Sequence, residues 1–281
     1  MILADDPLES ELGLARLDAA QGEYTEARRR LAAQLTDDLT PERRVDVLSA
    51  QLEMAVILGQ IRQALELNEE IIELSKSFVP PISRLVSIES RTPTLLALLG
   101  RYDEAIARAD EITRQLQPPF SSFMNFTYTE IYAETGDRDA FREQYPDLFG
   151  GFIAMETAQI ALWDGEPDAA IREIERARDI LDTSMLKLLG GNLSTSSVYV
   201  TLAELYLQAG AVEEAREVLE NLLKIFPSYG LAKLTLARVE MARGNPEAAR
   251  QLLTAALATW SAADAGYIHR QEAETLLMGL K

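Results

Sequence analysis

One short sequence motif recurs along the whole chain: the apolar end of a helical stretch, then a glycine, then an alanine about five residues later. Successive glycines of this motif are separated by 37, 41, 36, 29, 45 and 34 residues. A period of a few tens of residues is typical of solenoid proteins, in which each repeat is one small supersecondary unit. The glycines are Gly22, Gly59, Gly100, Gly136, Gly165, Gly210 and Gly244.

The residues of this motif predict two antiparallel helices joined by a short turn. Glycine ends a helix because it adopts the left-handed conformation without steric cost. Pro167 and Pro246 follow where a first-turn proline is tolerated, and Asp168 and Glu247 then place acid at a helix N-terminus. The small alanine lets the two helices approach closely. Each repeat is therefore expected to be an αα-hairpin.

The apolar periodicity predicts seven such helix pairs and one further helix. The last helix, at 265–280, has one apolar face and a polar opposite face, as a terminal cap requires. No strand is expected. The predicted pairs are 8–20/23–35, 42–58/61–77, 82–99/102–116, 121–135/137–145, 147–164/167–183, 196–209/212–226 and 230–243/246–260.

The unequal spacings predict two irregular joints. The 29-residue interval indicates a second helix cut short by Pro146. The 45-residue interval contains extra residues, which we place at 186–196. We therefore expect one continuous solenoid, with about five irregular helix pairs in 1–185, an insertion at 186–196, and two regular repeats plus the cap in 197–281.

The repeated motif resembles that of the tetratricopeptide repeat family. The copy around Gly136 departs from the family pattern, because Ala140 comes one residue early. The resemblance implies an all-α, right-handed αα-superhelix of about seven helix pairs and a C-terminal capping helix. Its best copy consists of Tyr199, Leu202, Ala203, Tyr206, Gly210, Ala215, Leu219, Leu222 and Pro227.

The composition excludes several classes of function. The formal net charge is −18, so binding to nucleic acid or to an anionic membrane surface is disfavoured. Cysteine is absent, which excludes disulfides, thiolate zinc sites and a cysteine nucleophile. No secretory signal is recognisable, and no apolar run is long enough to cross a bilayer. We expect a cytoplasmic protein without membrane insertion.

The sequence contains no recognisable catalytic or metal-binding constellation. His269 is the only histidine, and we expect it on the surface of the capping helix. An acidic stripe formed by Glu66, Glu69, Glu70 and Glu73 lies on one helix, and we expect a solvated outer face there. No glycine-rich phosphate loop is present. We expect no enzyme activity, no catalytic residue, no cofactor and no metal.

The resemblance also implies a binding surface, since the first helix of each pair lines the concave face in this family. Six of the eight phenylalanines fall between 120 and 152, and aromatic residues are enriched at interface cores. The alternative is that these rings only fill the joint near Pro146. The predicted partner-binding residues are Phe123, Phe126, Glu130, Phe152, Met155, Gln159, Trp163, Glu204 and Arg238.

The leading hypothesis for function is a scaffold that binds a peptide or helix of a partner protein. The alternative is a sensor that binds a small molecule or signalling peptide, which a closed aromatic pocket near 123–163 would favour. The groove positions offer Arg16 and Arg238 but no lysine or asparagine, so a carboxylate clamp for chaperone tails is not expected. The layout is also similar to repeat regions of bacterial regulatory proteins, which suggests a piece of a larger protein. The sequence indicates neither the partner nor the oligomeric state.

Overall fold

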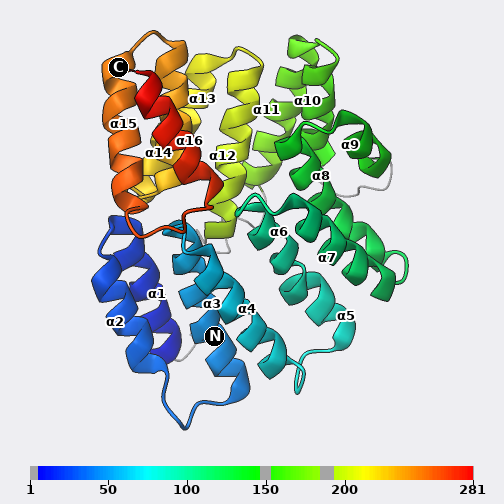
Figure 1. Cartoon of the computed structure of the whole chain (residues 1–281), viewed down its shortest axis with the longest axis vertical. Helices are drawn as coiled ribbons and strands as arrows, with labels where there is room; N and C mark the ends of the chain where they lie inside the picture. Colours follow the sequence, from blue (N-terminus) through cyan, green and yellow to red (C-terminus); the bar gives the residue numbers. More distant parts are fainter. Residues whose placement is uncertain (1–5, 146–152, 184–192, 281) are drawn as a thin grey trace.

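The structure is a computed structural model, and it describes residues 6–145, 153–183 and 193–280. All regular secondary structure in these ranges is helical, which confirms the all-α prediction. The helices follow one another in pairs, and α16 stands alone at the end (Figure 1). Pro146, Phe152 and most of the expected insertion lie outside the described residues. The end of that insertion is helical, because α12 begins at Leu193.

The helix pairs agree with the predicted ranges to within a few residues at most ends. They are α1 (Pro7–Gln21) with α2 (Tyr24–Gln34), α3 (Pro41–Ile57) with α4 (Ile61–Ser75), α6 (Arg91–Ala97) with α7 (Tyr102–Gln115), α8 (Met124–Thr135) with α9 (Arg138–Gln144), α10 (Ile153–Trp163) with α11 (Pro167–Thr183), α12 (Leu193–Gln208) with α13 (Val212–Ile225), and α14 (Gly230–Ala242) with α15 (Pro246–Thr259). A short helix α5 (Pro81–Arg84) and a π-helical turn (Leu85–Glu89) precede α6, a 3-10 turn (Phe120–Phe123) precedes α8, and α16 (Ile268–Gly279) follows α15.

The repeated glycines end the first helix of each pair as predicted. All seven have a positive φ, between 69° and 91°. At the first of them, the N–H of Gly22 donates to the carbonyl of Ala19, and the N–H of Glu23 donates to that of Asp18. This pattern closes the helix with its last carbonyls satisfied. The chain then reverses direction and starts the second helix.

The first helices of successive pairs lie on the inside of a curve. Contacts join α1 to α3, α6 to α8, α10 to α12, α12 to α14 and α14 to α16. The corresponding second helices have at most sparse contacts with one another. A stack whose first helices touch and whose second helices diverge must bend, with the first helices inside. The result is a superhelix of the tetratricopeptide type, as the sequence predicts.

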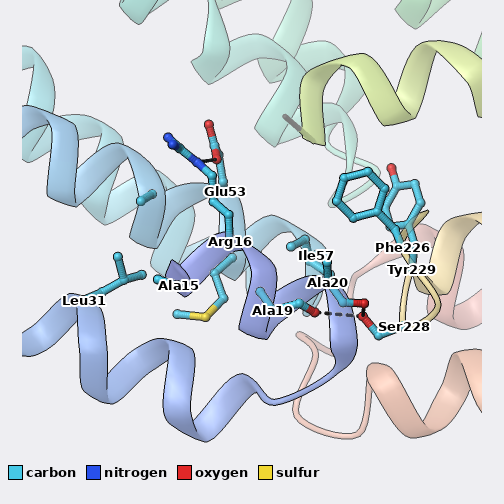
Figure 2. A pocket seen from close by; sticks show the side chains of 12 residues that line it. Ala15, Arg16, Ala19, Ala20, Leu31, Glu53, Ile57, Phe226, Ser228 and Tyr229 are labelled. Atoms are coloured by element: carbon cyan, nitrogen blue, oxygen red, sulfur yellow. Dashed lines mark hydrogen bonds and ion pairs between the residues drawn. The ribbon is translucent and has the colours of Figure 1, made fainter. Parts of the chain in front are cut away.

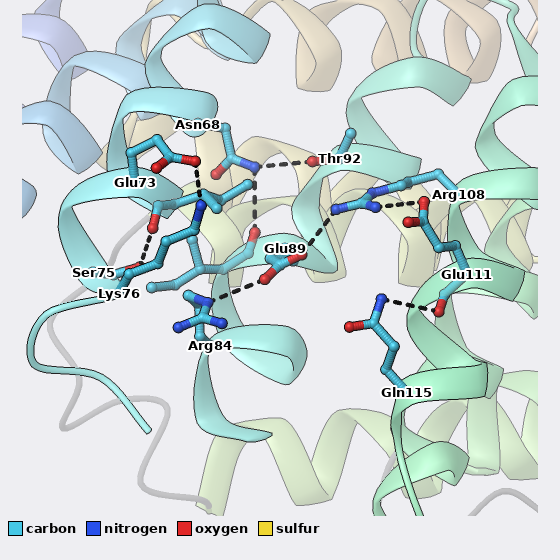
Figure 3. A network of polar contacts seen from close by, with 12 residues as sticks. Asn68, Glu73, Ser75, Lys76, Arg84, Glu89, Thr92, Arg108, Glu111 and Gln115 are labelled. Carbon is cyan, nitrogen blue, oxygen red and sulfur yellow. Dashed lines mark hydrogen bonds and ion pairs between the residues drawn. The ribbon is translucent and has the colours of Figure 1, made fainter. Parts of the chain in front are cut away.

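The third pair departs from regular geometry before α6. Pro93 has no N–H to donate to the carbonyl four residues earlier, and its ring crowds that carbonyl. The backbone widens just before it into a π-helical turn, in which the N–H of Ser90 donates to the carbonyl of Leu85 at 3.0 Å. Asn68 of α4 fastens this turn, because its Nδ2 donates to the carbonyl of Ile88 at 3.3 Å (Figure 3).

A buried ion-pair triad holds the same turn against its neighbours (Figure 3). The Glu89 side chain accepts from Arg84 Nε at 3.1 Å and from Arg108 Nη2 at 2.8 Å. Glu89 is 8% exposed, so its charge needs these partners. The triad connects the turn to α7 and leaves the Glu89 carboxylate fully paired.

The chain closes on itself, so that its N-terminal and C-terminal repeats are in direct contact. In Figure 1, α1 and α2 lie directly below α14 and α15. Hydrogen bonds cross this contact at several loops. They run from Ser228 Oγ to the carbonyls of Ala19 and Ala20 (both 2.8 Å), from Trp260 Nε1 to that of Ile57 (3.0 Å), from the Asp264 N–H to that of Gly59 (2.9 Å), and from the Ile268 N–H to that of Leu98 (3.1 Å). We call this contact the closure seam.

The hydrophobic core continues across the closure seam. Trp260, which is 1% exposed, packs in one cluster with Ile61 and Leu95 of the N-terminal repeats. Its ring also meets that of Tyr267 edge to face, with centroids 5.5 Å apart. The seam is therefore a packed interface and not a row of surface hydrogen bonds.

Candidate interaction surface

Four of the predicted binding residues lie on successive first helices: Glu130 on α8, Gln159 on α10, Glu204 on α12 and Arg238 on α14. Arg238 Nη1 donates to Glu204 Oε1 at 3.0 Å, which joins α14 to α12. Gln159 Nε2 donates to the Oε1 of Gln208 at 3.4 Å, which joins α10 to α12. These side chains are neighbours because the first helices pack side by side.

Additional carboxylates surround Arg238, and sequence reasoning missed them. Glu272 of α16 lies 3.6 Å from Arg238, measured from Oε1 to Nη1. Burial and then the charge of Glu272 raise the pKa of Glu134, which lies one turn beyond Glu130 on α8. We use the name acidic inner cluster for the group made up of Glu130, Glu134, Glu156, Glu204 and Glu272.

Two members of the acidic inner cluster have carboxylates whose pKa is raised mainly by desolvation. Glu130 keeps contact with solvent, but the surrounding helices desolvate its carboxylate and raise its pKa. Glu156 is more enclosed: burial raises its pKa to about 7, and Glu130 adds to the shift. Its Oε2 is buried without a hydrogen-bond partner in the described residues. Near neutral pH, Glu156 is therefore only partly ionised.

Two aromatic residues of the predicted surface, Phe123 and Trp163, make ring contacts at different elements. Phe123 stacks on Phe120, with centroids 6.4 Å apart, and it is 39% exposed. Trp163 meets Phe141 edge to face at 4.9 Å, and Arg138 lies over the Trp163 ring at 5.6 Å. Trp163 is therefore part of the joint between the α8–α9 pair and α10.

The other predicted apolar residues lie in or near the core. Met155 packs against the hydrophobic cluster formed by α10 to α14. Phe126 is half-buried on α8. Phe152, which was also predicted to belong to this surface, lies outside the described residues.

Three aromatic residues lie near the closure seam, and the sequence did not indicate that they come together there. Tyr229 precedes α14, Tyr267 precedes α16, and His269 lies in the first turn of α16. Burial and then the charge of Glu204 raise the pKa of Tyr229. His269 was expected on the surface, which is wrong: its ring meets Tyr267 edge to face at 5.3 Å. Burial, with a contribution from Arg238, lowers its pKa to about 4.

A small cavity lies between α1, α3 and the loop before α14 (Figure 2). Its volume is about 30 Å³, which is room for a water molecule and not for a metabolite. Arg16 and Glu53 line it and form an ion pair at 3.3 Å. In Figure 2 the Tyr229 hydroxyl points to the same side as this pair, away from the apolar part of the cavity.

The acidic stripe on α4 is a solvated outer face, as predicted. Glu66, Glu69, Glu70 and Glu73 are all exposed, and Glu70 pairs with Arg44 at 3.3 Å. Across the described ranges, histidines and carboxylates nowhere gather into a group that could hold a metal ion. Among the helices of those ranges, none combines the length and apolar character needed to span a membrane.

Comparison with known families identifies the repeats. Family models for the tetratricopeptide repeat match residues 9–33 and residues 206–259. These two segments are similar to tetratricopeptide repeats. The matched segments contain α1 and α2 at one end and α13 to α15 at the other. Both matches are to repeats, and neither is to a catalytic domain. Among curated protein sequences, none matches this chain significantly.

Solved structures with a similar arrangement include other repeat proteins of low identity. A tetratricopeptide repeat protein from Parabacteroides merdae is 12% identical, with a TM-score of 0.49, over 96% of this chain and 98% of that chain. The TPR2AB domain of yeast Sti1, in complex with pHSP90, is 12% identical with a TM-score of 0.36, over 97% and 98% of the two chains. BtubC from P. vanneervenii is 19% identical with a TM-score of 0.33, over 92% of each chain.

Proposed function

We propose that this tetratricopeptide repeat protein is a non-catalytic interaction module that binds a peptide segment of a partner protein along its first helices. The observation that carries the proposal is the row of polar side chains that these helices present inside the curve. Glu130, Gln159, Glu204 and Arg238 come from four successive pairs. An extended peptide could contact all four, because they follow one another along the superhelix.

Packing leaves these side chains available for a ligand. Each repeat buries its small residues, such as Ala203 and Ala237 at 0% exposure, between the helices. Glu130, Glu204 and Arg238 of the same helices keep contact with solvent, while Gln159 is 9% exposed and hydrogen-bonds to Gln208. Function in a solenoid depends on such a surface and not on the fold alone.

A small-molecule sensor, the alternative function, has less support. Between residues 120 and 163, ring contacts of the described residues include Phe120 with Phe123, Tyr128 with Tyr132 and Phe141 with Trp163, at different elements of the chain. A sensor pocket would require such rings to surround a common space. The cavity near Tyr229 is too small for a signalling metabolite.

Hydrogen–deuterium exchange tests the proposed surface. The probe is a peptide selected by the full chain from a random peptide library, measured in complex with that chain. We expect added protection on α8, α10, α12 and α14. Protection confined to the second helices α11, α13 and α15 would contradict the proposal. Failure to select any peptide would also contradict it.

A further inference from the structure

The acidic inner cluster contains more negative charge than the protein neutralises. Within the described residues, Arg238 is the only basic side chain in an ion pair with its five carboxylates, at 3.0 Å from Glu204 and 3.6 Å from Glu272. The contrast with Glu89 is direct, because Glu89 is held by two arginines. The uncompensated carboxylates repel one another across α8, α10 and α16, which raises the pKa of Glu134 and Glu156 beyond the effect of burial.

Two tyrosines near the closure seam have hydroxyls without a partner in the described residues, and Tyr229 is the one that lies near the acidic inner cluster. Tyr229 is 9% exposed and Tyr267 is 3% exposed, so their rings are packed in the protein. Neither hydroxyl forms a hydrogen bond with a described residue, and neither oxygen is sealed from solvent. Tyr229 is close enough to Glu204 for that carboxylate to act on its phenol. Buried tyrosines usually have a hydrogen-bond partner, so these two are available to one that comes from outside.

We propose that the acidic inner cluster binds an arginine- or lysine-bearing peptide segment of a partner protein, and that the hydroxyl of Tyr229 hydrogen-bonds to the same segment. This rests on the function proposed above and adds the chemistry of the partner. Guanidinium and ammonium groups form strong charge-assisted hydrogen bonds to carboxylates. They also relieve the repulsion among the glutamates. An acidic peptide or a nucleic acid would increase that repulsion and is excluded from this surface.

The composition of selected peptides is the first test. The full chain selects binders from a library of random peptides of about twelve residues, long enough to span several repeats. We expect the selected sequences to be enriched in arginine and lysine relative to the unselected library. Enrichment of peptides that lack both residues would overturn this inference, while the proposed interaction function would stand.

A charge-matched pair of variants is the second test. Glu134→Gln with Glu272→Gln removes two charges from the acidic inner cluster, and Glu66→Gln with Glu69→Gln removes two from the exposed face of α4. For a selected basic peptide, we expect affinity to fall by about tenfold or more in the inner variant and by less than about twofold in the outer one. Equal effects would show that only net charge matters and would overturn the inference.

Tyr229→Phe tests the hydroxyl separately. It removes one oxygen that has no partner in the described protein, so the melting temperature should stay unchanged. We expect affinity for the selected peptide to fall by about three- to tenfold, the usual effect of one lost hydrogen bond. Unchanged affinity would remove Tyr229 from the site. Absence of any selected peptide would instead count against the interaction function itself.

Discussion

Single residues on the first helices decide the electrostatics of the candidate surface. The resemblance to the tetratricopeptide family predicted that Glu130, Gln159, Glu204 and Arg238 lie on first helices, where the structure has them. Helical periodicity could have indicated Glu134 and Glu156, which lie on the same faces of α8 and α10. Their raised pKa values could not be predicted, because desolvation depends on helices far away in the sequence.

Glu156 gives a prediction at this level. Its pKa in the folded protein is about 7, above the usual 4.5 of a glutamate, so the folded state binds more protons than the unfolded state between these pH values. The ionised carboxylate is destabilising above pH 7, and the penalty disappears as pH falls below 4.5. Glu156→Gln should therefore raise the free energy of unfolding by about 1–3 kcal/mol at pH 8 and change it little at pH 4.5.

Urea denaturation at the two pH values measures this difference. The matched control is Glu247→Gln, whose side chain is 76% exposed, and no comparable change in stability is expected there. An effect of Glu156→Gln that is the same at both pH values would mean that the Glu156 carboxylate titrates normally.

Helix pairs depend on the size of a few residues where the two helices cross. Ala215 and Ala249 occupy equivalent places five residues after Gly210 and Gly244, and both are 0% exposed. The repeated motif identified these two alanines, because close approach of two helices requires a small side chain at the contact. The packing of the pair is thus a local property, which a repeat in the sequence can indicate.

Replacement of Ala215 or Ala249 by leucine should lower the free energy of unfolding by about 1–3 kcal/mol through overpacking. Thermal denaturation of the two variants measures the loss. Ala258→Leu is the control, because Ala258 lies on the same helix as Ala249 but is exposed. If both buried variants kept wild-type stability, the assignment of these alanines to the helix contact would be incorrect.

The joint between α9 and α10 yields a further prediction. Trp163→Ala removes the ring that packs on Phe141 and lies under Arg138, so it should cost about 2–4 kcal/mol of stability. Phe123→Ala should cost less, because Phe123 is 39% exposed. Melting temperatures and peptide affinities measured on the same variants separate packing from recognition. A loss of binding by Trp163→Ala without a loss of stability would return Trp163 to the binding surface.

The closure seam is a property of the whole molecule. It joins loops of the first three pairs to α14, α15 and α16. Gly59 lies within it, and a Cβ there would come 2.6 Å from the Tyr267 ring and 2.7 Å from Ala263 Cβ. Gly136 has nearly the same φ, 71° against 69°, but its Cβ would meet nothing within 4 Å.

These two glycines make a matched test of the seam. Alanine at either position carries the strain of a positive φ, about 1–2 kcal/mol. Gly59→Ala should cost about 1–3 kcal/mol more than Gly136→Ala, because it also overpacks the seam. Urea denaturation of both variants measures the difference. Equal losses of stability would mean that the seam is open in solution.

The sequence by itself determined the all-α class, the pairing of helices, the glycine stops and the inward-facing residues of α8 to α14. Each of these depends on contacts within one repeat or between neighbours, and such contacts leave a periodic pattern in the chain. The outer stripe on α4 was predicted correctly for the same reason.

Only the tertiary structure decided the closure of the superhelix and what the closure creates. Small rotations between successive repeats add up over seven pairs, so the place where the two ends meet is not visible in any one repeat. This meeting buries Trp260 against the N-terminal repeats, and the curvature of the stack brings Glu272 of α16 near Glu134 of α8. The sequence treated α16 as a cap with a surface histidine, because nothing near it in the chain indicates the N-terminal repeats that it contacts.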